Sequence, residues 1–468
     1  MDRDRQTFNL ISLDEIFQLL TLAKQRSIET HAQVLVSLTK PLPSTFDPIN
    51  VFALARRTNT IVNLWALPAK ESSIVGIGVA AEISSEGPLR FKKAAAQLQN
   101  MIGSAVVEPK TAPGPIFLGG FRFKSELPPD GPWQEFHDGL LSLPRWMLAS
   151  TAGRSSLTIN ATLDSQTDVE ALRKELTDQA LNLFRRQEHS PQPAAASVIA
   201  EPMQDDWGKK VVEVLDAIKD GEVSKVTLAR IMKLRAQANL SPEPILRSLT
   251  ANYPECRTFA FSRRGGSFVG ASPEELVSLN GEKVTSTCLA GSAPRGETEK
   301  TDFELSNWLL GNEKERREHK VVVDWVSERM GSLCNKLHWN DVPCVLRLGN
   351  VQHLATDFVG TRANGRHVLD FVEALHPTPA VGGIPLGPAL EMISRLEDFD
   401  RGWYTGPVGW VDMNGNGEFA IAIRCALLRG NEAFLYAGDG IVAGSDPDTE
   451  ERETAMKFKP LLSALGAP

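Results

Sequence analysis

The chain has 468 residues and a formal net charge of −8, with 42% hydrophobic and 23% charged residues. This composition is typical of a folded globular protein with two or three domains, or of one large α/β unit. The acidic balance argues against a general nucleic-acid binder, because neutralising phosphates requires a clustered basic excess. No apolar run approaches the roughly 18–20 residues that span a bilayer, and the N-terminus lacks an apolar signal core. We therefore expect a cytoplasmic protein without a membrane association.

The number and spacing of the cysteines are also those expected of a cytoplasmic protein. They are five in number and contain no CxxC pair: Cys256, Cys288, Cys334, Cys344 and Cys425. Such spacing suits neither a disulfide framework nor a zinc site. We expect reduced and mostly structural thiols.

The first part of the chain, residues 1–187, mixes helical and strand patterns. Hydrophobic periodicity predicts helices over 13–26, 92–106 and 168–186, the last capped by Asp168, and strands over 33–38, 60–67, 74–83, 116–123 and 156–163. Residues 188–205 resemble a linker, because prolines and small residues replace any amphipathic period.

The second part, residues 206–466, contains the clearest strands and most of the chemistry. Strands are predicted over 408–412, 418–428 and 433–437, and long helices over 207–220, 301–333 and 448–465. NGNG and RGNE separate the strands, and such tight turns join antiparallel neighbours. The chain therefore reads as an α+β protein with a large antiparallel sheet.

Several common catalytic motifs are missing from the sequence. It contains no GxxxxGK[ST], no GxGxxG between a strand and a helix, no HExxH and no GxSxG. What remains is a set of carboxylates, in which Glu450 and Glu453 share one helix face and Glu318 lies in a charged segment. Carboxylate sets suit Mg²⁺, although exposed helix faces often look the same.

Two strand ends rich in glycine add a second signal. LAGSAPRG (residues 289–296) and YAGDGIVAG (residues 436–444) each follow a β-like run, where backbone N–H groups become available to a ligand. A plain turn would explain either segment equally well.

Ten segments, taken in order, resemble the chorismate-utilising enzymes, and among them the isochorismate synthases most. They are VSKVTLAR, GASPEELV, LAGSAPRG, EKERREHK, VQHLAT, HPTPAVGG, FDRGWYTGPVGW, IAIRCA, YAGDGIV and EERETAMK, spread over residues 206–465. The resemblance implies the chorismate-binding α+β fold, with large stacked antiparallel sheets and outer helices. Residues 1–187 would complete this fold, and residues 206–466 would form its catalytic part.

The resemblance assigns the two proton-transfer roles. Lys225 falls on the family's general base, and it favours water over ammonia as the nucleophile because aminating relatives commonly carry glutamine there. Glu274, the first glutamate of SPEE, falls on the general acid. A lysine base requires a lowered pKa and a carboxyl acid requires a raised one. Glu275, next to it, has no matching role, and we expect it to be exposed.

The remaining roles are also carried over from the resemblance. Glu318 and Glu453 would bind Mg²⁺, with Glu450 coordinating directly or through water. The residues that would contact the substrate are Gly291, Ser292, His353, Ala380, Ile423, Arg424, Gly438, Gly440 and Lys457. Arg424 and Lys457 would hold substrate carboxylate. Ala380 is a second discriminator, because anthranilate-forming and salicylate-forming relatives generally carry threonine there.

One residue departs from the family pattern, which commonly reads AGAGIV where this chain has AGDGIV. Asp439 therefore stands between two glycines expected to contact the ligand. An aspartate facing the substrate would repel a dianion, and neighbouring strand residues face opposite sides. We expect Asp439 to point away from the glycine donors.

The resemblance as a whole implies an isochorismate synthase that uses chorismate and Mg²⁺, without an obligatory glutaminase partner, as a monomer or weak dimer. Three alternatives remain open. A salicylate synthase would share Lys225 and go on to eliminate pyruvate. An aminating subunit would need ammonia, and an inactive chorismate-binding regulator would need neither Lys225 nor Glu274. The residues do not select among menaquinone, siderophore and salicylate pathways.

Overall fold

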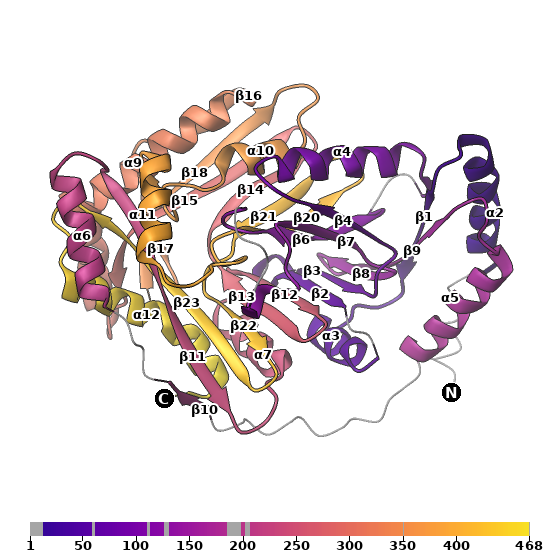
Figure 1. Cartoon of the computed structure of the whole chain (residues 1–468), viewed down its shortest axis with the longest axis horizontal. Helices are drawn as coiled ribbons and strands as arrows, with labels where there is room; N and C mark the ends of the chain where they lie inside the picture. The colour runs from indigo at the N-terminus through magenta and orange to yellow at the C-terminus, as the bar shows by residue number, and fades with distance from the viewer. Residues whose placement is uncertain are drawn as a thin grey trace.

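The computed structural model describes residues 13–58, 61–109, 113–125, 131–184, 198–201, 206–349 and 351–467. Within these residues, most strands belong to two large sheets (Figure 1). Helices pack against both: α3, α7 and α12 contact strands of the larger sheet, and α4, α9 and α10 contact strands of the smaller one. The helices are α2 (Leu13–Thr30), α3 (Pro48–Arg56), α4 (Arg90–Gly103), α5 (Val169–Phe184), α6 (Trp207–Lys219), α7 (Pro242–Asn252), α8 (Glu299–Gly311), α9 (Glu313–Gly331), α10 (Val368–Leu375), α11 (Leu386–Leu396) and α12 (Pro447–Leu465).

The larger sheet runs in the order β10-β11-β23-β22-β13-β12-β2-β3-β8-β9-β1-β5, with β19 beside β11. Its strands are β10 (Val198–Ala200), β11 (Lys225–Ala236), β23 (Glu432–Val442), β22 (Cys425–Arg429), β13 (Gly266–Ser272), β12 (Arg257–Arg263), β2 (Val62–Leu67), β3 (Ser72–Ile77), β8 (Trp146–Thr151), β9 (Arg154–Leu163), β1 (Val34–Leu42), β5 (Val106–Glu108) and β19 (Gly383–Ile384). Among these described strands, the β1–β5 pair is parallel and the other pairs are antiparallel.

The smaller sheet runs in the order β16-β18-β15-β14-β21-β20-β6-β7-β4, with β17 beside β18. Its strands are β16 (Cys334–Trp339), β18 (Val351–Arg362), β15 (Lys283–Pro294), β14 (Glu275–Asn280), β21 (Gly417–Ile421), β20 (Pro407–Asp412), β6 (Ile116–Phe121), β7 (Gly139–Leu143), β4 (Ala81–Ser85) and β17 (Cys344–Arg347). The expected hairpins are confirmed, since β20 pairs with β21 and β22 pairs with β23, both antiparallel.

An aromatic core joins the two sheets. Phe259 and Phe268 of the larger sheet share one buried cluster with Leu118 and Val408 of the smaller sheet. Trp403, which is 1% exposed, packs edge-on against Phe268 within this cluster. Burying such large rings supplies much of the free energy that holds stacked sheets together. The expected α+β architecture of stacked sheets with outer helices is confirmed.

Both parts of the chain contribute to both sheets. β2 pairs with β12 in the larger sheet, and β6 pairs with β20 in the smaller one. Figure 1 shows these early strands in indigo and purple beside the later strands in pink and orange. Most of the linker-like segment lies outside the described residues, but Val198–Ala200 within it forms β10 and pairs with β11.

Three predicted elements are each two elements in the structure. The strand expected over 74–83 ends at Ile77 and resumes as β4 in the other sheet, after Gly78 adopts a positive φ of 64°. The strand expected over 418–428 is likewise β21 in one sheet and β22 in the other. The helix expected over 301–333 divides at Asn312, whose side chain caps α9. Continuous apolar patterns cannot reveal where a chain changes layers.

Asp168 caps α5 as expected, because its carboxylate accepts bonds from two backbone N–H groups of the first turn. All five cysteines lie in the described residues and are free. In the part of the chain that is described, we find no helix with both the length and the hydropathy to cross a membrane.

Candidate active site

A cavity opens where the chain passes between the two sheets. It encloses about 680 Å³ of empty space, part of it open to solvent. Two sheet crossovers border it, the β13–β14 connection and the β21–β22 connection. The cavity brings together most of the site residues predicted from the sequence: Glu274, Gly291, Ser292, Glu318, His353, Ala380, Ile423, Arg424, Gly438, Gly440 and Lys457.

Glu274 lies in the β13–β14 crossover and is 5% exposed. Burial raises the pKa of this carboxyl to about 8, against the opposing effect of the nearby charges of Lys225 and Arg424. Its own backbone is held in place, because the N–H of Ile421 donates to the Glu274 carbonyl at 3.2 Å. A buried carboxyl of this kind keeps its proton near neutral pH, which suits a general acid.

Glu275, which we expected to be exposed, is buried, and this expectation was wrong. Its carboxylate forms an ion pair with Arg257 and accepts a hydrogen bond from the Thr285 hydroxyl. The two neighbouring glutamates face different surroundings because the chain crosses between sheets at this point. One serves the cavity, and the other ties β14 to β12.

Lys225 is the first residue of β11 and is 1% exposed. Its ammonium lies 2.7 Å from Oε1 of Glu318, and the two groups form an ion pair. A Cβ at Gly440 would come within 2.8 Å of the same Glu318 oxygen and 3.0 Å of Lys225 Nζ. The pair therefore lies directly against a strand residue that lines the cavity. Lys225 itself lines a second cavity, which shares Glu318 with the first.

Arg424 occupies the β21–β22 crossover with a positive φ of 51°, which a side chain other than glycine adopts at a cost in free energy. It lines the cavity and is 9% exposed. Within the described residues, its guanidinium makes no hydrogen bond or ion pair. A buried and unpaired guanidinium of this kind suits a carboxylate ligand.

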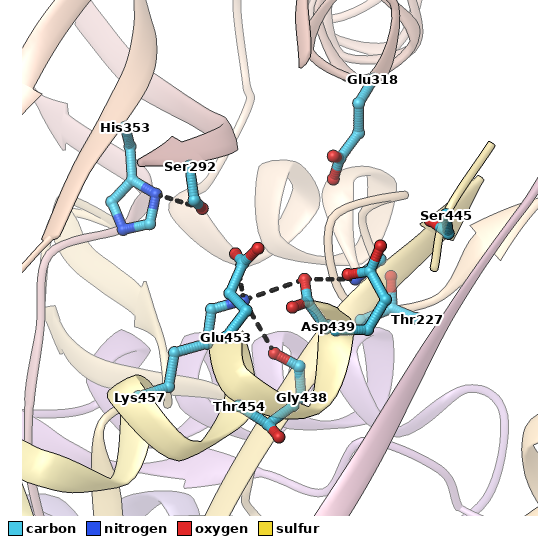
Figure 2. A network of polar contacts seen from close by, with 12 residues as sticks. Thr227, Ser292, Glu318, His353, Gly438, Asp439, Ser445, Glu453, Thr454 and Lys457 are labelled. Carbon is cyan, nitrogen blue, oxygen red and sulfur yellow. Dashed lines mark hydrogen bonds and ion pairs between the residues drawn. The ribbon is translucent and has the colours of Figure 1, made fainter. Parts of the chain in front are cut away.

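The carboxylates of α12 lie near Lys457, the residue of that helix that lines the cavity. Glu450 is 1% exposed and pairs with Lys314 of α9 at 3.0 Å. Glu453 pairs with Lys457 at 3.0 Å, and the attraction of this ammonium outweighs burial and holds the pKa of Glu453 well below its usual value. Lys457 also bonds to Asp439 (Figure 2). Burial alone would lower the pKa of Lys457, but the two carboxylates raise it, so the ammonium stays charged.

The three predicted metal ligands do not all converge. One oxygen each of Glu450, Glu453 and Asp439 lies within 4.8 Å of the others. Glu318 points toward Asp439 and Glu453 from α9 (Figure 2), but its carboxylate pairs with Lys225. The oxygen-only donor set fits a hard divalent cation such as Mg²⁺. In the structure, Lys314 and Lys457 form ion pairs with these carboxylates. A bound cation could compensate the same negative charges.

Glu315 is a candidate site residue that the sequence reading missed. It is 8% exposed, and its Oε2 accepts the backbone N–H of Ser292 at 2.9 Å. Burial and the nearby charge of Glu318 raise its pKa to about 7. The signal was present, because Glu315 and Glu318 are three residues apart on α9, the same spacing as Glu450 and Glu453 on α12.

His353 and Ser292 face each other across neighbouring strands. Ser292 Oγ lies 2.9 Å from Nδ1 of His353. Burial, together with the positive charges of Arg424 and Lys457, lowers the pKa of His353 to about 3. The imidazole is therefore neutral at physiological pH and offers a hydrogen bond rather than a charge.

Local geometry explains why these two strand ends carry glycine. Gly291 adopts a φ of 78° at a β-bulge in β15. A Cβ at Gly438 would lie 2.7 Å from a backbone carbonyl and 2.9 Å from the Tyr404 hydroxyl. Close packing therefore requires glycine at Gly438 whether or not its N–H binds a ligand. Asp439, expected to point away from the glycine donors, instead accepts the backbone N–H of Gly440, holds Lys457 and lines the cavity.

Comparison with known proteins identifies the family to which this chain belongs. The family model described as "Chorismate binding enzyme" matches residues 21–466. This chain is a member of the chorismate-binding enzyme family. It is 34% identical to the isochorismate synthase MenF of Bacillus subtilis over 95% of this chain and 96% of that protein. It is 33% identical to the salicylate biosynthesis isochorismate synthase of Pseudomonas aeruginosa, with 90% and 88% covered.

A solved structure agrees with this membership. The menaquinone-specific isochorismate synthase MenF of Escherichia coli superimposes with a TM-score of 0.77 at 25% sequence identity, over 95% of this chain and 99% of that one. The match covers residues from both parts of the chain. The chorismate-binding enzyme described here therefore shares the fold of a relative along nearly its whole length.

Proposed function

We propose that this chorismate-binding enzyme is an isochorismate synthase, an isomerase that converts chorismate to isochorismate with Mg²⁺. Its sequence similarity to isochorismate synthases extends over most of the chain. The observation that carries the proposal is Glu274, a buried carboxyl with a pKa raised to about 8 beside the cavity. A protonated carboxyl can donate a proton to a departing hydroxyl, which binding alone would not require.

The reaction requires two proton transfers. A water oxygen forms a bond to one ring carbon, the C4 hydroxyl leaves, and the ring double bond shifts between them. Lys225 accepts the proton lost by the attacking water, and Glu274 donates a proton to the departing hydroxyl. One water enters and one leaves, so the product is an isomer of the substrate.

Lys225 must be a neutral amine before it can accept that proton. Its Nζ forms an ion pair with Glu318, whose Oε1 is 2.7 Å away. Because Glu318 is also a proposed ligand of Mg²⁺, a bound cation would draw its carboxylate away from Lys225. In this proposal Lys225 is the base, and Glu318 positions it and links it to the cation site.

Arg424 and Lys457 bind the substrate carboxylates from two sides. Arg424 offers an unpaired guanidinium, and Lys457 a buried ammonium that remains charged. Glu318, Glu450 and Glu453 would hold Mg²⁺, with Glu315 close by, and the bound cation would compensate the charge of the ring carboxylate. His353, being neutral, lines the ring side without adding charge.

Ala380 would keep the enolpyruvyl group on the product. It lies in the loop after α10 and lines the cavity. A methyl side chain leaves room where a threonine would add a hydroxyl and a branch. Together with Lys225, this favours isochorismate as the final product over salicylate, and it removes the need for a glutaminase partner.

The test is incubation of the purified chain with chorismate and Mg²⁺, followed by separation of the products. We expect isochorismate without added ammonia and without a second protein. Salicylate with pyruvate would indicate a salicylate synthase, and an aminated product in the presence of ammonia would indicate an aminating subunit. No conversion would indicate a binding protein and would contradict the proposal.

A further inference from the structure

Asp439 lies near the C-terminal end of β23 and is 6% exposed. Its Oδ1 accepts hydrogen bonds from Lys457 Nζ at 3.0 Å and from the backbone N–H of Gly440 at 2.9 Å. Its Oδ2 is buried and makes no hydrogen bond with any described residue. Burying a carboxylate oxygen without a partner costs free energy. A ligand bound at Oδ2 would therefore stabilise this side chain.

The surroundings of Asp439 indicate which ligand would satisfy it. One oxygen of Asp439 lies within 4.8 Å of one oxygen each of Glu450 and Glu453. Opposite oxygens of an octahedral Mg²⁺ site are about 4.2 Å apart, twice the usual Mg–O distance. The three carboxylates are thus nearly at coordination spacing, and they come from two separately held elements, β23 and α12.

The charges point the same way. Lys457 is shared between Asp439 and Glu453, while Lys314 pairs with Glu450. Two buried carboxylates and the partly buried Glu453 therefore face two ammonium groups. A divalent ion in their midst would compensate all three carboxylates and free Lys457 from part of its pairing.

We propose that Asp439 is a direct carboxylate ligand of the divalent cation, together with Glu450 and Glu453. When the cation is absent, Asp439 pairs with Lys457, and when it binds, Asp439 turns to it and leaves Lys457 available for a substrate carboxylate. This inference rests on the proposed function in one respect, namely that the cation belongs to the same site.

The test is a titration of the full chain with Mn²⁺, followed by electron paramagnetic resonance of the free ion, without substrate. Asp439→Asn keeps the side chain's size and removes its charge, and we expect its Mn²⁺ affinity to fall about tenfold or more. Asp324→Asn is the matched control, because Asp324 is an exposed partner of Lys320 on α9 and should leave the affinity unchanged. An affinity of Asp439→Asn within twofold of the wild type, or tighter, would overturn the inference.

Folding and turnover are measured separately. Circular dichroism reports whether Asp439→Asn is folded, and Asp439→Ala serves as a second variant with the same expected loss of affinity. If the wild-type chain binds Mn²⁺ but forms no isochorismate, the proposed function fails and the ligand assignment stands. If it forms isochorismate while both variants bind Mn²⁺ normally, the ligand assignment fails and the proposed function stands.

Discussion

On the β23–α12 side of the cavity, buried charges have partners of opposite sign: Glu450 with Lys314, and Glu453 and Asp439 with Lys457. On the sheet-crossover side, Glu274 and Arg424 are buried without an ion pair among the described residues. Pairing preserves the ionised form of an acid, whereas burial without a partner favours its neutral form. The ionised groups of α12 are thus suited to binding charge, whereas Glu274 on the crossover side is suited to giving up a proton.

The largest expected effect comes from Lys225→Ala, which removes the base and leaves Glu318 unpaired. We expect turnover to fall on the order of 10³-fold or more while the protein still binds ligand with Mg²⁺. Isochorismate formation, measured by product separation, checks this. Lys233→Ala is the matched control, because Lys233 lies on the same strand and pairs with Glu432 away from the cavity. Undiminished turnover in Lys225→Ala would reject the base assignment.

Glu274→Gln tests the unpaired side. We expect kcat to fall by about 10²–10³, because glutamine has no acidic proton to give. Wild-type activity should also decline above about pH 8, where the carboxyl loses its proton. Glu275→Gln is the control: it weakens the ion pair with Arg257 and should cost about 2 kcal/mol of stability while the folded enzyme keeps its kcat. Equal losses of kcat in both variants would erase the distinction between the two glutamates.

Glu453→Gln tests the paired side. We expect Mg²⁺ affinity to fall about 10–100-fold, with a smaller effect on turnover at saturating Mg²⁺. Calorimetric titration of the cation measures it. Glu451→Gln is the control on the same helix, because Glu451 is half-exposed and pairs with Arg230. Unchanged metal affinity in Glu453→Gln would remove this residue from the ligand set.

A smaller effect concerns stability and pH. The folded-state pKa of Glu274 is about 8 against an ordinary value of 4.5, so the native state holds a proton that the unfolded state has lost between these pH values. The stabilising contribution of this proton is fully present below pH 4.5 and is lost as the pH rises to about 8. Urea unfolding at several pH values should show this decline in the wild type relative to Glu274→Gln. Parallel curves for the two proteins would contradict the raised pKa.

Much of the site was readable from local sequence. Glu450, Glu453 and Lys457 lie three and four residues apart in one helical segment, and a helix places such residues on one face whatever surrounds it. The turns NGNG and RGNE predicted antiparallel partners for the same reason, because a tight turn leaves the chain few alternatives. The order of motifs along the chain indicated the family.

The breaks between elements were not readable. An apolar run looks the same whether it continues in one sheet or crosses to another, so the separation of β21 from β22 at Arg424 was missed. The break at Asn312 was missed as well, and with it the role of Glu315. The start of α9 at this point brings Glu315 to the Ser292 backbone. Glu275 was misjudged because its partner Arg257 is distant in sequence and becomes a neighbour only through strand pairing.

The amino-acid sequence by itself determined which side chains are available and which of them share a helix face or a turn, because these relations depend on a few consecutive residues. Only the tertiary structure decided that Glu274 is a buried acid, that Lys225 is held by Glu318, and that Asp439 joins the carboxylates of α12. Burial and charge pairing depend on atoms brought together from distant segments, and the stacking of the two sheets creates that environment.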